Sequence, residues 1–156
     1  MGTKILVALD DSENAMRAVE FVARTFIPEH QVTLFSVLAD TAAIFDIQSP
    51  ELTPYFVSQR NVFSSLEDKK RELVTGALQK AKETLVRAGF KEQDIAIKVQ
   101  NRKIGVARDI IDEARSGYQV IVMGRRGLSG ISEFLLGSVS QKVLHACKDA
   151  TILLVT

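Results

Sequence analysis

The chain has 156 residues, 46% of them hydrophobic and 25% charged, which is the composition of a single globular domain large enough to bury a core. A net charge of +1, with no run of more than three basic residues, argues against a dedicated nucleic-acid-binding protein. No apolar run reaches the length that crosses a membrane, and the single cysteine, Cys147, cannot form an intrachain disulfide. We therefore expect one cytoplasmic domain over residues 1–156.

The first elements are a strand, a helix and a second strand. Lys4 to Leu9 is continuously apolar after its lysine, the pattern of a parallel strand covered on both faces. Residues 10–12 are two aspartates and a serine, which can cap a helix, and apolar residues then recur every three or four positions as far as Phe26. Pro28 ends this helix, and Gln31 to Leu38 is expected to form the second strand.

The segment from Asp40 to Ser65 shows no sustained period. It contains Pro50 and Pro54 among many apolar residues, and a structureless loop of this length is uncommon in a compact domain. We expect short helical turns packed on the rest of the protein. A long helix then follows from Leu66 to Ala88, with apolar residues on one face and Gly89 at its end.

Strands and helices continue to alternate to the end of the chain. The expected elements are a strand at Ile95–Gln100, a helix at Val106–Arg115, a strand at Val120–Met123, a helix at about Ser138–Ala146 and a strand at Thr151–Val155. This alternation predicts right-handed crossovers and an α/β fold, in which a single open five-stranded parallel sheet has helices on both faces. We expect the strand order 3-2-1-4-5.

A glycine-rich segment follows the fourth strand and leads to the last helix. Gly124, Gly127 and Gly130 let a ligand approach the backbone, and the helix start at residues 137–140 (Gly-Ser-Val-Ser) offers free N–H groups to a phosphate. Ligands bind open parallel sheets at the C-terminal ends of the strands, where the strand order reverses, so the expected order brings Asp10 beside Gly124. These features predict a nucleotide-phosphate site, although the spacing matches neither the Rossmann fingerprint nor a P-loop.

The whole pattern, G-x2-G-x9-G-S, begins at Gly124 directly after a strand that ends in VMG, and it runs into GSVS. It resembles the ATP-binding branch of the universal stress protein family. The similarity covers nearly the whole chain, including the segments KILVALDDSENA, LFSVLAD, GVARDIIDEA and LLGSVSQKVL. The resemblance implies an adenine nucleotide alpha hydrolase-like fold.

The resemblance also implies which residues bind the nucleotide. Ala8 and Asp10 would line the site, and the backbone of Val37 would pair with adenine, with Met123 beneath the ring. The implied contacts are Ala8, Asp10, Val37, Met123, Gly124, Arg126, Gly127, Gly137, Ser138, Val139 and Ser140. The implied ligand is ATP, ADP or AMP, with Mg²⁺ or Mn²⁺ bridging the phosphates and reaching Asp10.

Several of these residues have a simpler explanation. Asp10 can cap the first helix, and Ser138 can cap the last one, without any ligand. Arg125 and Arg126 can pair with phosphates or remain solvated, and both readings stay open. Asp11 stands where many members of the family have glycine, and its carboxylate would either weaken ATP binding by repulsion or favour a metal-bound form.

The sequence contains no motif of a reacting centre. It lacks the HIGH-type and SGGxDS-type motifs of ATP-activating relatives of this fold, and the expected strand order assembles no Ser/His/Asp or Cys/His set. The resemblance therefore implies a nucleotide-dependent regulatory or stress-response switch, not an enzyme, with at most slow ATP hydrolysis or autophosphorylation. The alternative is a protein-interaction module whose crevice stays empty. A flavodoxin-like or ATP-activating enzyme would need a motif that is missing.

The last strand predicts association. Thr151–Val155 is short and apolar and is expected at the edge of the sheet, where unpaired backbone groups favour pairing with another strand. Two copies paired antiparallel through this strand would form a closed homodimer, which is common in the family. The alternative is an edge covered by the chain's own helices. We expect neither a nucleic acid nor a membrane as partner.

Overall fold

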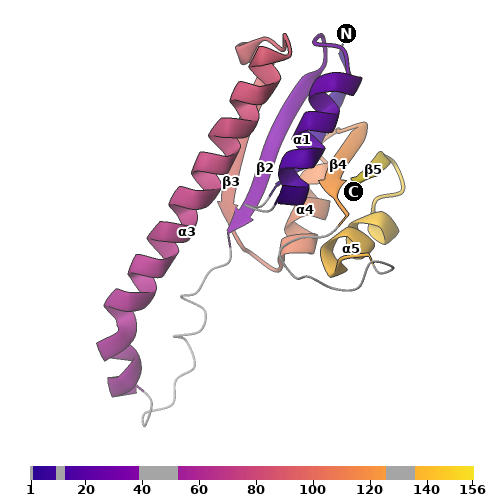
Figure 1. The fold of residues 1–156 in the computed structure, drawn as a ribbon. Helices are drawn as coiled ribbons and strands as arrows, with labels where there is room; N and C mark the ends of the chain where they lie inside the picture. The colour runs from indigo at the N-terminus through magenta and orange to yellow at the C-terminus, as the bar shows by residue number, and fades with distance from the viewer. Residues whose placement is uncertain (1, 10–12, 39–52, 126–135) are drawn as a thin grey trace.

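The computed structural model describes residues 2–9, 13–38, 53–125 and 136–156, and within these ranges strands and helices alternate along the chain (Figure 1). The elements are β1 (Lys4–Ala8), α1 (Glu13–Thr25), β2 (Gln31–Leu38), α3 (Thr53–Arg87), the short 3-10 helix η1 (Glu92–Asp94), β3 (Ile95–Asn101), α4 (Val106–Ala114), β4 (Val120–Gly124), α5 (Ser138–Ala146) and β5 (Thr151–Val155). Each strand expected from the sequence is present, and its ends lie within one residue of those predicted.

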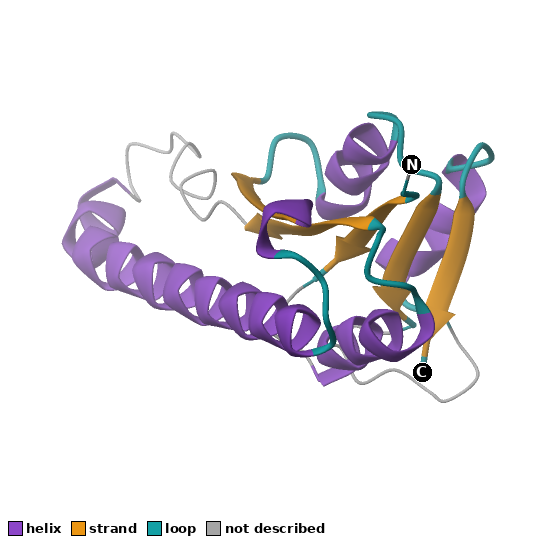
Figure 2. Ribbon diagram, turned by 90° about the horizontal axis from the view of Figure 1, so that it is seen from above, coloured by secondary structure: helices purple, strands orange, loops and turns teal. Residues whose placement is uncertain are grey.

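The strands form one parallel sheet in the order β3-β2-β1-β4-β5, which confirms the predicted topology (Figure 2). β1 is central, because Ile5 pairs with Val32 of β2 on one side and with Val120 of β4 on the other. A central strand is covered on both faces, so side chains of both orientations must be apolar. Residues 5–7 are accordingly 0% exposed.

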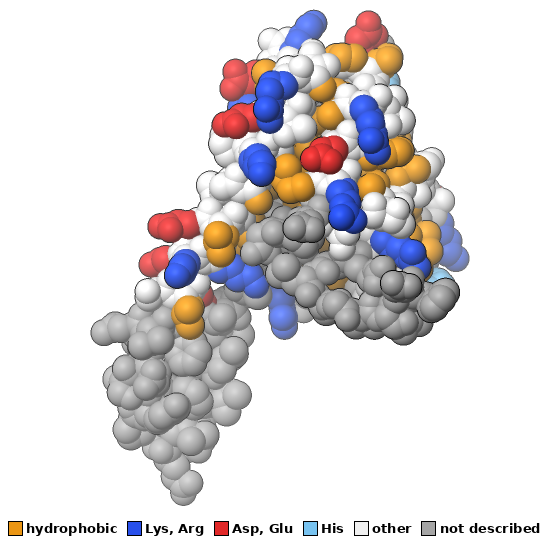
Figure 3. All heavy atoms as spheres, in the orientation of Figure 1, with side chains coloured by type: hydrophobic (Ala, Val, Ile, Leu, Met, Phe, Trp, Pro, Cys, Tyr) orange, Lys and Arg blue, Asp and Glu red, His pale blue; other side chains and the backbone are white. Residues whose placement is uncertain are grey.

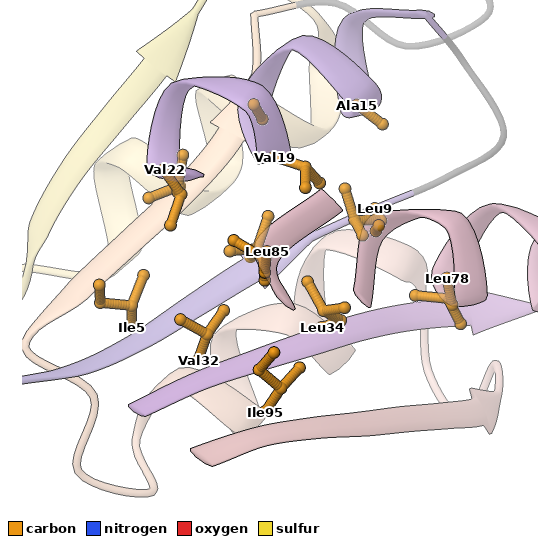
Figure 4. Packing of buried hydrophobic residues seen from close by; sticks show 14 of the residues in the cluster. Ile5, Leu9, Ala15, Val19, Val22, Val32, Leu34, Leu78, Leu85 and Ile95 are labelled. Atoms are coloured by element: carbon orange, nitrogen blue, oxygen red, sulfur yellow. The ribbon is translucent and has the colours of Figure 1, made fainter. Parts of the chain in front are cut away.

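Within the described ranges, two helices cover each face of the sheet. α1 and α3 pack on the face that carries Ile5 and Val7, whereas α4 and α5 pack on the face that carries Leu6 and Ala8. This division follows from the two-residue period of side chains along a strand. Figure 4 shows the first layer, in which the two helices and the sheet contribute Ile5, Val19, Val22, Val32, Leu34, Leu78 and Leu85.

α3 begins earlier than the sequence pattern indicated. It starts at Thr53 with Pro54 in its first turn, where the missing N–H of proline has no helical partner to lose, and it is 35 residues long. The prediction of short helical turns is therefore wrong for residues 53–65, which belong to one continuous helix. Residues 40–52 of that segment lie outside the described residues.

The apolar stripe of α3 that faces the core does not begin at the start of the helix. Figure 1 shows these turns extending past the C-terminal ends of the strands, and Figure 3 shows charged side chains of both signs along the helix. Leu66 and Leu73 are 55% and 56% exposed, and the core-facing stripe of α3 starts only at Val74. An amphipathic pattern reflects burial, so a helix that leaves the core does not carry one.

Glycines end two of the helices, as predicted. Gly89 after α3 and Gly117 after α4 have φ angles of +104° and +89°, a left-handed conformation that glycine adopts without strain. None of the helices in the described ranges combines the length and the apolar character that crossing a membrane requires.

Candidate functional site

Three of the residues that the family pattern assigns to the site lie on one face of the sheet, near the C-terminal ends of their strands. Ala8 of β1 is the register partner of Met123 of β4, and their side chains are 8% and 4% exposed. Val37 of β2 is partly buried and packs against the same apolar cluster, which lies beneath α4 and α5. Small and apolar side chains thus lie together at the C-terminal ends of these three strands.

The backbone of Val37 points beyond the end of β1. The N–H of Leu9 donates a hydrogen bond of 2.8 Å to the carbonyl oxygen of Phe35, so the odd-numbered residues of β2 face β1. The carbonyl of Leu38 faces β3 instead, where it accepts a hydrogen bond of 2.7 Å from the N–H of Arg102. Because backbone groups alternate in direction along a strand, the N–H and C=O of Val37 face the β1 side, past the last residue of β1. A backbone donor and a backbone acceptor are therefore directed to the β1 side of β2, past the end of β1.

Packing favours glycine at position 124. A Cβ added there would lie 3.0 Å from the carbonyl carbon, the oxygen and the Cβ of Asn14, in the first turn of α1. The end of β4 therefore lies directly against the start of α1, which is a packing reason for glycine at this position. This contact also places the start of α1 beside the site, although Asp10 itself lies outside the described residues.

The start of α5 is capped by a residue without a side chain. Gly137 is the N-cap, with φ −59° and ψ 150°, and Ser138 is the first helical residue. The suggestion that Ser138 caps this helix is therefore wrong. The first helical hydrogen bond runs from the N–H of Gln141 to the carbonyl of Gly137, at 3.0 Å. The N–H groups of residues 138–140 precede it and have no acceptor within the helix, an arrangement that favours an anion.

Ser140 joins this helix start to the end of β4. Its hydroxyl lies 3.0 Å from the carbonyl oxygen of Gly124 and 3.2 Å from that of Arg125, and the residue is 3% exposed. The carbonyl of Arg125 also accepts a hydrogen bond of 3.1 Å from the N–H of Gly137. The N–H of Arg125 donates a hydrogen bond of 2.8 Å to the carbonyl of Val155. Backbone and hydroxyl bonds thus hold β4, β5 and α5 in one arrangement, and the glycine pattern did not indicate these bonds.

Asp109 is a residue that sequence reasoning missed. Its carboxylate is buried, with the residue 2% exposed, and it accepts hydrogen bonds from the N–H groups of Lys103 at 2.7 Å and Ile104 at 3.3 Å. These bonds fix the loop between β3 and α4, which borders β2 through Arg102 and Leu38. The only signal was an acid in the first turn of a predicted helix, a position that stabilises helix starts in general.

A perturbed acid lies at the other end of α4. Burial raises the pKa of Glu113. Hydrogen bonds from the Lys98 ammonium at 2.7 Å and the Tyr118 hydroxyl at 2.8 Å lower it, and together with the positive charge nearby they outweigh burial, so the pKa lies below its ordinary value. Helices of a parallel sheet run opposite to the strands, which places the last residues of α4 at the N-terminal ends of the strands. This ion pair therefore belongs to the scaffold rather than to the site.

Asp10, Arg126 and Gly127 complete the predicted contacts, and all three lie outside the described residues. Among the residues that the structure does describe, no three His, Cys, Asp or Glu side chains are grouped so as to hold a metal ion. The metal contact at Asp10 therefore stays a prediction.

Comparison with known proteins identifies the family. The sequence profile of the Universal stress protein family matches residues 1–153. The chain belongs to the universal stress protein family. Among curated members, a universal stress protein of Mycolicibacterium smegmatis is 29% identical over 142 residues, which are 90% of this chain but only 44% of that protein, so the chain spans less than half its length. Universal stress protein YxiE of Bacillus subtilis is 28% identical over 144 residues, 92% of each chain.

Solved structures of the family have the same fold. Protein MJ0577 of Methanocaldococcus jannaschii is 25% identical with a TM-score of 0.70, and the match covers 99% of this chain and 96% of that one. A universal stress protein in complex with cAMP is 20% identical with a TM-score of 0.62, covering 99% and 97% of the two chains. A universal stress protein of Archaeoglobus fulgidus in complex with dAMP is 16% identical with a TM-score of 0.62, covering 100% and 98%.

Proposed function

We propose that this universal stress protein binds an adenine nucleotide and acts as a nucleotide-dependent regulatory or stress-response switch. The observation that carries the proposal is the meeting of two complementary features at one edge of the sheet. The backbone of Val37 offers a donor and an acceptor past the end of β1, and the N–H groups of residues 138–140 begin α5 beyond β4. The family relatives solved with cAMP and dAMP support the idea that this fold accommodates adenine nucleotides.

Each part of the nucleotide has a place in the proposed site. The adenine would lie on the floor formed by Ala8 and Met123, with its polar edge against the backbone of Val37. The phosphates would lie at the start of α5, where backbone N–H groups and the positive end of the helix dipole compensate negative charge. Asp10 would hold Mg²⁺ or Mn²⁺ that bridges the phosphates, because a hard divalent cation prefers carboxylate and phosphate oxygens.

The proposed role is binding, with at most slow hydrolysis or autophosphorylation. The phosphate segment contains no lysine to stabilise phosphoryl transfer, and its positively charged residues are Arg125 and Arg126. Occupancy would follow the cellular concentration of ATP, ADP or AMP, and the occupied and empty forms would differ in the surface that a partner meets.

Purification and calorimetry test the proposal. Mass spectrometry of protein purified from cells should detect an adenine nucleotide, and titration with Mg-ATP should give saturable heat. The double variant Gly127→Val, Gly137→Val should lose the nucleotide while keeping its circular dichroism spectrum. Gly105→Ala is the matched control, since nothing lies within 4 Å of a Cβ added at that N-cap of α4. Nucleotide retained by the double variant would refute the site, and a wild-type protein that binds none would favour the interaction module.

We also propose a homodimer through β5. Among the described residues this strand pairs with β4 alone, and Ile152 to Val155 are half-buried rather than covered. Two copies of one strand satisfy each other's edge groups when they pair antiparallel about a two-fold axis.

A further inference from the structure

Two serines begin α5, and their surroundings differ. Ser138 is exposed to solvent at the first helical position, whereas Ser140, two residues later, is 3% exposed. A serine hydroxyl has a single proton to donate. In Ser140 the hydroxyl lies 3.0 Å from the carbonyl of Gly124 and 3.2 Å from that of Arg125, and a carbonyl oxygen can only accept. The proton of this hydroxyl is therefore shared between the carbonyl of Gly124, the last residue of β4, and that of Arg125, the residue after it.

These contacts join segments that are far apart in the chain. Ser140 lies 16 positions after Gly124 and 15 after Arg125. The carbonyl of Arg125 also accepts the N–H of Gly137, the N-cap of α5, while its own N–H donates to Val155 of β5. The direction in which the first N–H groups of α5 point is therefore set relative to the sheet by a small set of hydrogen bonds, and the Ser140 hydroxyl supplies one of them, shared between two carbonyls.

We propose that Ser140 is a positioning residue of the nucleotide site. Its hydroxyl holds the start of α5 against the end of β4, and the phosphates are contacted by the N–H groups of residues 138–140 rather than by this hydroxyl. The assignment rests on the proposed nucleotide-binding function and deepens it, because it states which groups of α5 meet the ligand. A binding site whose groups are held in place before the ligand arrives avoids the entropic cost of ordering those groups during binding.

The test compares Ser140→Ala, Ser140→Thr and Ser138→Ala with the wild type in two measurements. Amide hydrogen exchange of the protein without nucleotide reports the bonds at the helix start, and calorimetry with Mg-ATP reports affinity. For Ser140→Ala we expect exchange at Gly137 and Gln141 to be about tenfold faster and the Kd for ATP to rise about tenfold, the effect of one lost buried hydrogen bond. Ser140→Thr keeps the hydroxyl and should remain within about threefold of wild type in both measurements.

The two measurements separate the possible outcomes. Ser138→Ala should leave exchange at Gly137 and Gln141 unchanged, because its hydroxyl is exposed. If Ser140→Ala loses ATP affinity while exchange in the empty protein stays at the wild-type rate, the hydroxyl acts on the ligand directly and the positioning role is overturned. Unchanged exchange together with unchanged affinity also overturns it. If the wild type binds no nucleotide, the proposed function fails, while the exchange comparison still decides whether Ser140 holds the helix start.

Discussion

Replacing Gly124 by alanine places a methyl group between the end of β4 and the first turn of α1. The new Cβ would lie 3.0 Å from the carbonyl carbon and oxygen of Asn14, closer than the usual van der Waals separation of about 3.5 to 4.0 Å. Two of the three nearest atoms are backbone, so α1 must move to relieve the contact. Overpacking of this kind costs about 1 to 3 kcal/mol of unfolding free energy. For a domain of this size the melting temperature should fall by about 2 to 12 °C.

Gly76→Ala is the matched control for that variant. Gly76 lies in the exposed face of α3, and nothing lies within 4 Å of a Cβ added there. Alanine in a helix interior is favoured over glycine by about 0.5 to 1 kcal/mol, so this variant should melt above the wild type. Thermal unfolding followed by circular dichroism, with urea unfolding as a second measure, distinguishes the two signs. A Gly124→Ala protein that melts at or above the wild-type temperature would show that β4 and α1 are not in contact as described.

Three further predictions follow from the charges, the cysteine and the sheet edge. Glu113→Gln should lower the unfolding free energy by about 1 to 2 kcal/mol at pH 7. Because the pKa of Glu113 is depressed from its ordinary 4.5, this difference should shrink as the pH falls below that value, and a difference equal at pH 7 and pH 3 would contradict the assignment. Burial raises the pKa of the Cys147 thiol, so iodoacetamide should react more slowly with the folded than with the unfolded protein at pH 7.5; equal rates would mean an exposed thiol. Leu153→Lys should convert a dimer to a monomer in sedimentation velocity, and an unchanged dimer would place the interface outside β5.

The strands and their order were predictable because burial leaves a direct record in the sequence. The run from Ile5 to Val7 is apolar at every position since helices cover both faces of β1. The helical spacing of apolar residues in α1 and α4 likewise reflects one face turned to the sheet. The alternation of elements predicted a parallel sheet but did not determine the strand order, which was assumed; the structure has that order, and β1 and β4 are neighbours as expected.

Contacts between distant residues were not predictable. The core-facing stripe of α3 starts only at Val74, and no sustained apolar period in the sequence marks the start of the helix at Thr53. Gly124 reads as a ligand-binding glycine, and only the folded chain shows that Asn14 occupies the space beside it. The hydrogen bonds of Ser140 were not predictable either, because its carbonyl partners, Gly124 and Arg125, are 16 and 15 positions away in the chain.

The central claim is that one edge of the sheet binds an adenine nucleotide through the backbone of β2 and the start of α5. Titration of nitrogen-15-labelled protein with Mg-ATP, followed by amide chemical shifts, tests it residue by residue. We expect saturable shifts at Val37 and at residues 138–140. Little change is expected at Glu113, near the C-terminal end of α4, and at Tyr118, which follows that helix, because both lie at the opposite end of the sheet from the proposed site. Absence of any shift, or shifts confined to Glu113, Tyr118 and their neighbours, would contradict the proposed nucleotide site.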